Sequence, residues 1–251
     1  MEGKSYVLNI WLFLIFFPVW AFCQGIQDEK TLPEILCRST TGEIKIDGNL
    51  DESDWKNAES VEFVKIISLE KPVSRTIAYC LYDRKYLYVA FKCYDRDIWA
   101  TYQKRDQPLY QEDVVEIFFK PDFSKDSYYE FEFSPKNIIL DAFVGKRALA
   151  GNMFFRFAQW NCIGLKSSVK IKGTLNDWSD IDDYWTIEIA IPFQSLPSIK
   201  KIPEKGDIWL FNLARYDYSI YVEDGMELVT AGRITKFDLH RYQEWCFLKF
   251  Q

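Results

Sequence analysis

VVEIFFKPDFSKDSYYEFEF, residues 114–133, contains two apolar, aromatic-rich runs of strand length. The runs are Val114–Phe119 and Tyr128–Phe133, and a loop of proline, aspartate, serine and lysine joins them. Broad and β-branched side chains pack well on a pleated surface, whereas the loop residues favour turns. The stretch therefore predicts two successive β-strands.

Similar runs recur along the chain and predict further strands. They are Arg75–Tyr82, Tyr86–Tyr94, Val169–Gly173, Trp185–Ile191, Ile208–Arg215 and Trp245–Phe250. Helical periodicity is confined to one or two turns at Glu52–Ala58 and Phe193–Leu196. Many short strands separated by turns predict an all-β fold, a two-sheet antiparallel β-sandwich. Nothing resembles a linker between two halves, so we expect one domain over residues 43–251.

The N-terminus has the layout of a secretory signal peptide. Lys4 supplies a positive charge, Tyr6–Phe22 is almost wholly apolar, and small residues precede the expected cleavage site after Cys23. We therefore expect residues 1–23 to be a signal peptide and the protein to be secreted or periplasmic. An uncleaved membrane anchor is the alternative. Residues 24–42 are polar and irregular, which predicts a linker or a first edge strand.

The composition argues against several classes of protein. A net charge of −6 opposes binding to the phosphate backbone of nucleic acid, and no basic cluster offsets it. The chain has one histidine, His240, which rules out zinc or copper sites built from several histidines. It has no glycine-rich nucleotide motif. The aromatic content of 18% suits both a sandwich core and a sugar-binding surface, and the core explanation comes first.

The cysteines offer little to hold the fold together. Six are present and one of them is Cys23, so an odd number follows the signal peptide and at least one lacks an internal partner. Cys80 and Cys93 flank one predicted turn, but the pairing expected across it keeps them too far apart to bond. A disulfide between Cys37 and Cys246, which would join the terminal strands, is a hypothesis.

The glutamate in VVEIFF is the most informative polar residue. Strand alternation places Glu116 on one face together with Val114 and Phe118. A carboxylate there is costly to bury, so it either pairs with an arginine or lysine or faces a polar cleft. With Asp113 or Glu188 it would also offer the paired carboxylates of a glycoside hydrolase.

A second polar intrusion occurs in IWLFNLAR, residues 208–215. Asn212 and Arg215 lie on opposite faces by strand parity, so only one of them can face a cleft lined by Glu116 unless a bulge intervenes. Arg215 is either a counter-ion to a carboxylate or a residue at the rim with its charged head in water.

Two acidic loops offer hard oxygen ligands for calcium. Asp47 and Asp51 lie in one loop, and Asp180 and Asp182 lie in the other. Neither loop has EF-hand spacing, and aspartate also serves as an ordinary turn residue. The four aspartates are calcium candidates, and the sequence requires no cofactor.

Several stretches, taken in order, resemble the family 9 carbohydrate-binding modules, particularly the single-domain family 9-like proteins exported by bacteria. They are IKIDGNLDESDW (44–55), YDRKYLYVAFKCYDRDI (82–98), RDQPLYQEDVVEIFFKPD (105–122), YYEFEFSPKN (128–137), GTLNDWSDIDDYWTIEIAIPF (173–193), GDIWLFNLARYD (206–217) and FDLHRYQEWCFLKF (237–250). The resemblance implies a jelly-roll-like β-sandwich, often with bound calcium, that holds a sugar or a chain end without cleaving it.

The resemblance also implies a site. In the best-understood members the sugar lies between two tryptophans, and a strand glutamate bonds its hydroxyls. Matched by motif, Tyr110 takes the place of the first tryptophan, Glu116 that of the glutamate, and Asp113 an acidic position. No aromatic residue in Glu227–Arg233 replaces the second tryptophan, and an arginine that binds sugar in some members falls at about Glu132. A tyrosine of the adjacent loop could take the place of the second tryptophan, and the candidates are Tyr216, Tyr218 and Tyr221.

The preferred hypothesis is non-catalytic binding of an oligosaccharide or polysaccharide end in support of glycan breakdown. Asn212, Arg215 and Tyr216 are the further candidates for contacts with the sugar, and glycan-degrading enzymes or transport proteins are the expected partners. The alternatives are an interaction sandwich with a degenerate sugar site and a glycoside hydrolase that uses Asp113 and Glu116.

A haem- or redox-binding relative of such sandwiches is a further alternative. It would need a Met/His axial pair. After processing, only His240, Met153 and Met226 could supply one.

Overall fold

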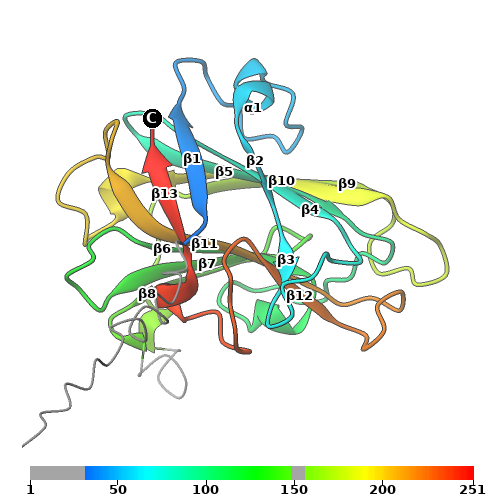
Figure 1. Ribbon diagram of the computed structural model, residues 1–251. Helices are drawn as coiled ribbons and strands as arrows, with labels where there is room; N and C mark the ends of the chain where they lie inside the picture. The colour runs from blue at the N-terminus through cyan, green and yellow to red at the C-terminus, as the bar shows by residue number, and fades with distance from the viewer. Residues whose placement is uncertain (1–31, 148–155) are drawn as a thin grey trace, which may run out of the picture. The chain divides into compact units, whose positions relative to one another are not determined.

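The computed structural model describes residues 32–147 and 156–251, and these residues form two packed layers of β-strands (Figure 1). The predicted all-β sandwich is confirmed. The predicted signal peptide over residues 1–23 lies outside the described residues. Among the helices of the described residues, none is long and apolar enough to cross a membrane.

The strands are short and cover most of the described chain. They are β1 (Glu34–Ser39), β2 (Ser60–Glu62), β3 (Val64–Lys65), β4 (Thr76–Tyr82), β5 (Tyr86–Tyr94), β6 (Val114–Lys120), β7 (Tyr128–Phe133), β8 (Ile139–Val144), β9 (Lys166–Lys172), β10 (Tyr184–Pro192), β11 (Ile208–Asp217), β12 (Glu227–Thr230) and β13 (Cys246–Phe250). The helices are α1 (Ser53–Asn57) and the 3-10 helices η1 (Leu109–Gln111), η3 (Phe193–Ser195) and η4 (Tyr242–Glu244).

The strands follow one hydrogen-bonded order, β8-β7-β6-β11-β13-β1-β4-β5-β10-β9. The first layer contains β8, β7, β6, β11 and β13, and the second contains β4, β5, β10 and β9. β1 connects the two layers (Figure 1). Outside this order, β12 pairs with β11 and β3, and β2 pairs with β4. β1 departs from the predicted antiparallel arrangement because it runs parallel to both β13 and β4.

The first strand also differs from the linker or edge strand that the sequence predicts for residues 24–42. Residues 34–37 of β1 pair with β13 and residues 38–39 pair with β4, so the strand passes from one layer to the other. Ile35 is 3% exposed and Cys37 is fully buried, which anchors this strand in the core. Its short run EILCRS carries only alternating apolar residues, and that pattern does not reveal whether a strand has one neighbour or two.

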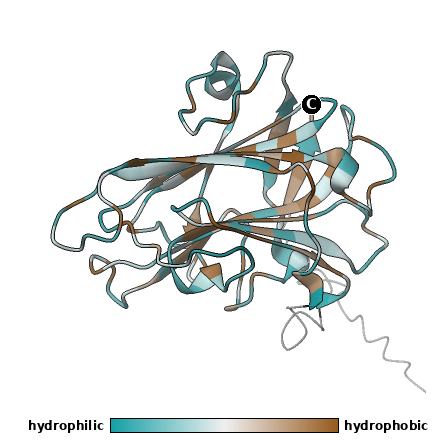
Figure 2. Cartoon of the chain, turned by 180° about the vertical axis from the view of Figure 1, so that it is seen from behind, coloured by the Kyte–Doolittle hydropathy of each residue, from teal (hydrophilic) through white to brown (hydrophobic). Residues whose placement is uncertain are grey.

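The inner faces of the two layers meet in an aromatic core. Phe119 stacks on Phe131 and on Trp209, with ring centroids 5.7 and 5.5 Å apart. Such pairs contribute about 0.5–1.5 kcal/mol each beyond the area that they bury. Hydrophobic residues concentrate along the strands and hydrophilic residues in the loops (Figure 2). A large share of the aromatic residues therefore serves the core.

The cysteines among the described residues are buried free thiols. The β4–β5 hairpin keeps Cys80 and Cys93 apart, as predicted. The hypothesis of a disulfide between Cys37 and Cys246 is wrong, because the parallel register places Cys37 opposite Phe250. Phe250 is four residues from Cys246, roughly 13 Å along the strand.

Arg215 lies fully buried between the layers on the inner face of β11. Its guanidinium is 2.7 Å from the carboxylate of Asp95 and 3.3 Å from that of Asp217. It also donates hydrogen bonds to the carbonyl oxygen of Tyr94 (2.9 Å) and the hydroxyl of Thr76 (3.3 Å). Burial opposes the charged form, but Asp217 and Asp95 outweigh it and raise the pKa of Arg215. Of the two roles inferred from the sequence, the counter-ion is confirmed and the rim position is wrong.

Replacing Arg215 with methionine should be strongly destabilising, because it leaves two buried carboxylates without a cation. We expect Arg215→Met to lower the free energy of unfolding by about 3–5 kcal/mol, as measured by urea denaturation. Arg75→Met is the matched control, because the Arg75–Glu62 pair is half exposed and should matter little. Equal effects of the two substitutions would contradict a structural role for the buried network.

Candidate functional site

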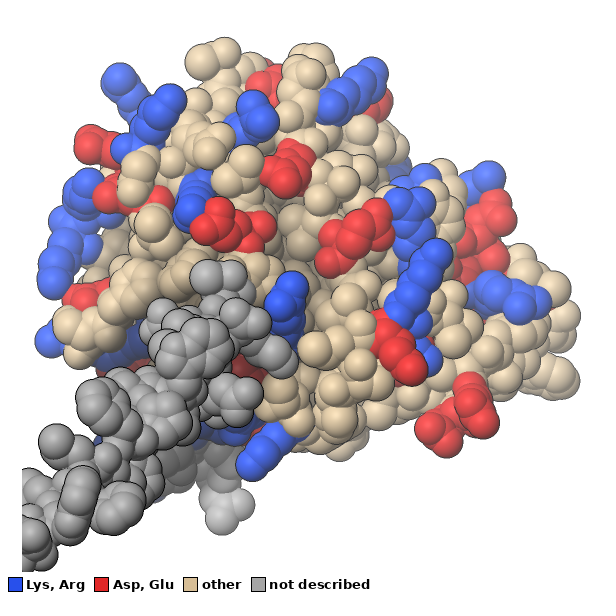
Figure 3. Space-filling view, in the orientation of Figure 1, with Lys and Arg blue, Asp and Glu red and all other residues tan. Residues whose placement is uncertain are grey.

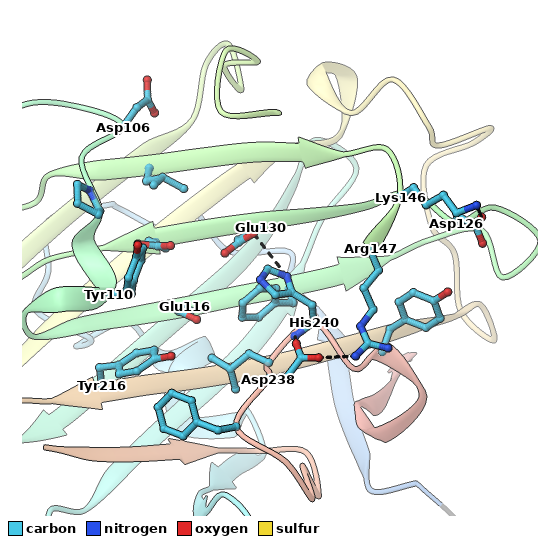
Figure 4. Close-up of a pocket in the computed structure, with 17 residues that line it drawn as sticks. Asp106, Tyr110, Glu116, Asp126, Glu130, Lys146, Arg147, Tyr216, Asp238 and His240 are labelled. Atoms are coloured by element: carbon cyan, nitrogen blue, oxygen red, sulfur yellow. Dashed lines mark hydrogen bonds and ion pairs between the residues drawn. The ribbon is translucent and has the colours of Figure 1, made fainter. Parts of the chain in front are cut away.

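A cleft of about 840 Å³ opens over β6, β7 and β11, on the face of the first layer that points away from the core (Figure 4). Strand residues form its floor, and the segments around η1 and before η4 contribute walls. Its lining includes the carboxyl groups of Glu116, Glu130 and Glu132 and the aromatic rings of Tyr110, Tyr216 and Phe237.

The pleat of β6 and β7 places carboxylates on this floor. Val115 and Ile117 point into the core, so Glu116 between them points into the cleft. Glu116 lies opposite Glu132 of β7, and Glu130 shares the face of Glu132 two residues earlier. Glu116 was predicted from the sequence and Glu130 was not, although the alternation in YYEFEF places both β7 acids on one face.

These three carboxyl groups are buried and have few partners. Glu116 is 2% exposed, Glu132 is 1% exposed and Glu130 is 4% exposed. Among the described residues, no lysine or arginine makes an ion pair with any of them, and the nearest basic group is His240, 3.9 Å from Glu130. Within the described part of the chain, one oxygen of Glu130 and one of Glu132 have no hydrogen-bond partner. The structural ion pair considered for Glu116 is therefore not formed in this part of the chain.

Burial controls the protonation of the floor. It raises the pKa of Glu116 well above its usual range, and the charge of Glu130 adds to the effect. Burial likewise raises the pKa of Glu132, followed by repulsion from Glu116 and Glu130. Burial also raises the pKa of Glu130, although His240 opposes it. Ionisation of each of the three groups therefore costs free energy, and no lysine or arginine of the described chain offsets that cost.

Aromatic side chains form the walls. Tyr110, from η1, is 42% exposed, and Tyr216 projects from the end of β11 (Figure 4). Tyr218 supports both, since its ring stacks on Tyr216 at 6.3 Å and its hydroxyl donates to the carbonyl oxygen of Tyr110 at 2.9 Å. Phe237 adds a further ring that is 60% exposed. The motif match did not identify Phe237, because it lies in a loop that approaches the sheet only in the folded chain.

Of the proposed substitutes for the second wall, only Tyr216 lines the cleft. Tyr218 acts as its support, and Tyr221 lies under the guanidinium of Arg96, 3.8 Å from its ring centroid. At the other end of the cleft, Arg147 pairs with Asp238 (Figure 4). This end is charge-balanced, unlike the floor.

Three sequence candidates do not reach the cleft. Asp113 is fully buried and its carboxylate accepts hydrogen bonds from the backbone amides of Trp99 (2.6 Å) and Tyr218 (2.7 Å). Asn212 shares the face of Glu116, but it lies under the chain that follows β12 and accepts a bond from the amide of Gly232 (2.9 Å). Arg215 points into the core on the opposite face, as strand parity requires. These predictions of sugar contacts are corrected accordingly.

The carboxylate pairs considered for a glycoside hydrolase are not assembled. Glu188 belongs to the second layer, where its carboxylate accepts bonds from the amides of Asp47 (2.9 Å) and Gly48 (2.7 Å) and from the indole of Trp55 (2.9 Å). It therefore anchors the 47–55 loop. Asp113 is engaged by backbone amides and cannot face Glu116 across a bound sugar.

The calcium candidates are used as turn residues. Asp47 pairs with Lys45 at 2.6 Å and accepts a bond from the amide of Asn49. Both oxygens of Asp182 accept backbone amides, from Ile98 and Thr174. The other two candidates, Asp51 and Asp180, are exposed. The four side chains therefore do not fit a shared calcium site.

The described residues contain one group of three acids with ligand atoms within 4.8 Å of one another. It consists of Asp95, Asp113 and Asp217, and the guanidinium of Arg215 already contacts two of them. An arginine supplies the positive charge there, so this group is an ion-pair network.

The residues named for haem ligation include one outside the described part of the chain, Met153. Nδ1 of His240 lies 2.8 Å from the hydroxyl of Tyr128, within hydrogen-bonding distance. Met226 packs against the cluster around Phe118 and Trp245. His240 thus has a structural partner at one ring nitrogen.

The fold and the cleft define a β-sandwich with an open cleft on one outer face. The chain belongs to the family described as carbohydrate family 9 binding domain-like, whose model matches residues 46–229. Among curated proteins, no sequence matches the chain significantly.

Solved structures share the fold. A protein of Bacteroides uniformis, described as a candidate carbohydrate-binding protein, is 12% identical with a TM-score of 0.66, over 88% of this chain and 100% of its own. A family 9 carbohydrate-binding module from Caldicellulosiruptor kristjanssonii, in complex with cellotriose, is 15% identical with a TM-score of 0.59, over 87% and 93%. The same kind of module in complex with glucose is 16% identical with a TM-score of 0.59, over 87% and 95%.

Removing the charge of Glu132 should stabilise the protein in a pH-dependent way. A carboxyl whose pKa is raised by folding adds stability below its unfolded value of 4.5, and this contribution is lost as pH rises toward the folded value. We expect Glu132→Gln to raise the free energy of unfolding by about 1–3 kcal/mol at neutral pH, and to change it little below pH 4.5. Urea denaturation at several pH values measures the difference.

The exposed Glu59 provides the control, since Glu59→Gln should leave stability unchanged at every pH. If Glu132→Gln destabilises the protein at neutral pH, its carboxylate has a partner that stabilises the charge, and our account of the floor is wrong.

Proposed function

We propose that this protein binds a carbohydrate in the cleft without cleaving it. One observation carries the proposal: Glu116 and Glu132 are buried carboxyl groups that line an open cleft and make no ion pair with any described lysine or arginine. Exposed aromatic rings stand beside them. This combination suits a ligand with apolar faces and polar edges.

The chemistry of a pyranose matches both parts of the site. Its C–H faces can lie against the rings of Tyr110 and Tyr216, which remove apolar surface from water. Its hydroxyl groups can form hydrogen bonds with the carboxyl group of Glu116, and a typical bond of this kind contributes about 0.5–1.5 kcal/mol. A carboxylate alone would bind many cations, and a tyrosine alone many apolar groups. Together they favour a sugar.

Membership of the family supports this function, because the family is described by carbohydrate binding. The C. kristjanssonii modules that share the fold were solved with cellotriose and glucose. We propose an oligosaccharide or polysaccharide end as the ligand and, from the apolar segment at residues 6–22, action outside the cytoplasm. Glycan-degrading enzymes or transport proteins are the proposed partners.

Removing one wall or the floor acceptor should weaken binding without unfolding the protein. We expect Tyr110→Ala and Glu116→Gln each to lower the affinity for a bound glucan oligomer about tenfold. Isothermal titration calorimetry with glucose and cellotriose measures the loss, and thermal unfolding checks that the variants remain folded. Tyr94→Ala is the matched control, because Tyr94 is an exposed tyrosine on the other layer, outside the cleft.

Two results would contradict the proposal. Failure of the unmodified protein to bind any sugar on a glycan array would favour an interaction sandwich with a degenerate site. Release of reducing ends from a bound glycan would show that the protein is an enzyme.

Unfolding of Tyr110→Ala would mean that Tyr110 belongs to the core and that the wall has been misassigned.

A further inference from the structure

The acids on the cleft floor lack the counter-charge that other acids have. On the face shown in Figure 3, acidic and basic side chains are interspersed. In the core, Arg215 contacts Asp95 and Asp217. On the floor, the only basic side chain at ion-pair distance among the described residues is His240, beside Glu130. Three buried carboxyl groups therefore share, at most, one cation.

The basic residues at the far end of the cleft do not correct this imbalance. Arg147 pairs with Asp238, and Lys146 lies 3.9 Å from Asp126. Each of these cations has its own acid, so neither is available to Glu116 or Glu132. The net charge of the floor is negative whenever its carboxyl groups ionise.

The spacing of the floor acids suits a group larger than a bare metal ion. Among the described residues, only Asp95, Asp113 and Asp217 bring three ligand atoms within 4.8 Å of one another. Glu116 and Glu132 face each other across neighbouring strands, where Cβ atoms are about 4.5–5.5 Å apart. Glu130 lies about 7 Å further along β7. The flexible carboxyl ends of two such residues can converge on one ammonium group, which has three donors.

We propose that the cleft selects a carbohydrate with a free amino group, such as a glucosamine residue, over the neutral or N-acetylated sugar. This inference rests on the proposed function and specifies the class of sugar. The ammonium would donate to the carboxyl groups of Glu130 and Glu132, each of which has one buried oxygen without a hydrogen-bond partner among the described residues, and these side chains would turn toward the cleft to meet it. Tyr110 and Tyr216 would contact the ring, as they would for a neutral sugar.

The preference follows from the cost of burying charge. An ionised carboxyl in a desolvated site is expensive without a cation, and the ligand's ammonium provides that cation. A hydroxyl group gives only an ordinary hydrogen bond, and an acetylated amine gives no charge at all. Bonds between charged groups are roughly twice as strong as neutral ones. A uronic acid would be repelled.

The test compares three ligands that share one ring. We expect the whole protein to bind glucosamine about tenfold more tightly than glucose and N-acetylglucosamine at neutral pH and low salt, by calorimetry. The advantage should shrink as salt increases. Glu132→Gln and Glu130→Gln should lower the ratio of glucosamine affinity to glucose affinity toward one. Glu59→Gln, outside the cleft, should leave the ratio unchanged.

The outcomes separate this inference from the proposed function. If glucose binds and glucosamine has no advantage, the selection is overturned while sugar binding stands. If no sugar binds, both fail. An advantage that survives Glu130→Gln and Glu132→Gln places the amine elsewhere and overturns the assignment. Binding that disappears with a chelator would mean that a metal ion occupies the floor, which also overturns it.

Discussion

The register between β6 and β7 is the constraint on which both the core and the cleft depend. Because side chains alternate along a strand, the register that points Ile117 and Phe131 into the core also points Glu116 and Glu132 into the cleft. A slip of one residue would exchange the two faces. Burying a large apolar side chain contributes about 1.5–3 kcal/mol, and each carboxylate forced into the core would cost more than that. The hydrophobic pattern therefore fixes the position of the acids.

The chain solves the problem of buried charge in two different ways. Between the layers, Arg215 meets Asp95 and Asp217, so an internal cation balances the acids and the network belongs to the framework. On the cleft floor, Glu116 and Glu132 meet no lysine or arginine of the described chain. Acids without a cation at an open cleft can be balanced by a group from solution, which is why the proposed site rests on the second group and not on the first.

Much of the fold was predictable because its information is local. Each strand carries its own apolar run, and the hairpin register of β4 and β5 follows from a short turn. Glu116 stood out for the same reason, as a carboxylate within an apolar run. The parallel pairing of β1 was not predictable, since it depends on β13 and β4, which are distant in the sequence.

The site was only half predictable for a related reason. Strand parity showed that Arg215 and Asn212 could not both face the cleft. It could not show that a neighbouring segment of the chain covers Asn212. Asp113 was selected because it matches an acidic position of the family motif, but its carboxylate accepts hydrogen bonds from two backbone amides. Phe237 was missed, since a loop residue shows its position only when the chain is folded. Residues on strands were thus assigned by pattern, and residues in loops were not.

The division between strands and loops also bears on how such a site can change. The carboxylates of the floor are fixed by pairing on both sides of β6, so their positions are set before a ligand arrives. The walls come from η1 and from the segment with Phe237, and loop residues can be replaced without disturbing the core. In the proposed binding mode, this preformed floor would select the functional groups of the ligand, because its carboxyl groups are already in place. The exchangeable aromatic walls would set how much of the sugar ring is covered, and hence the affinity.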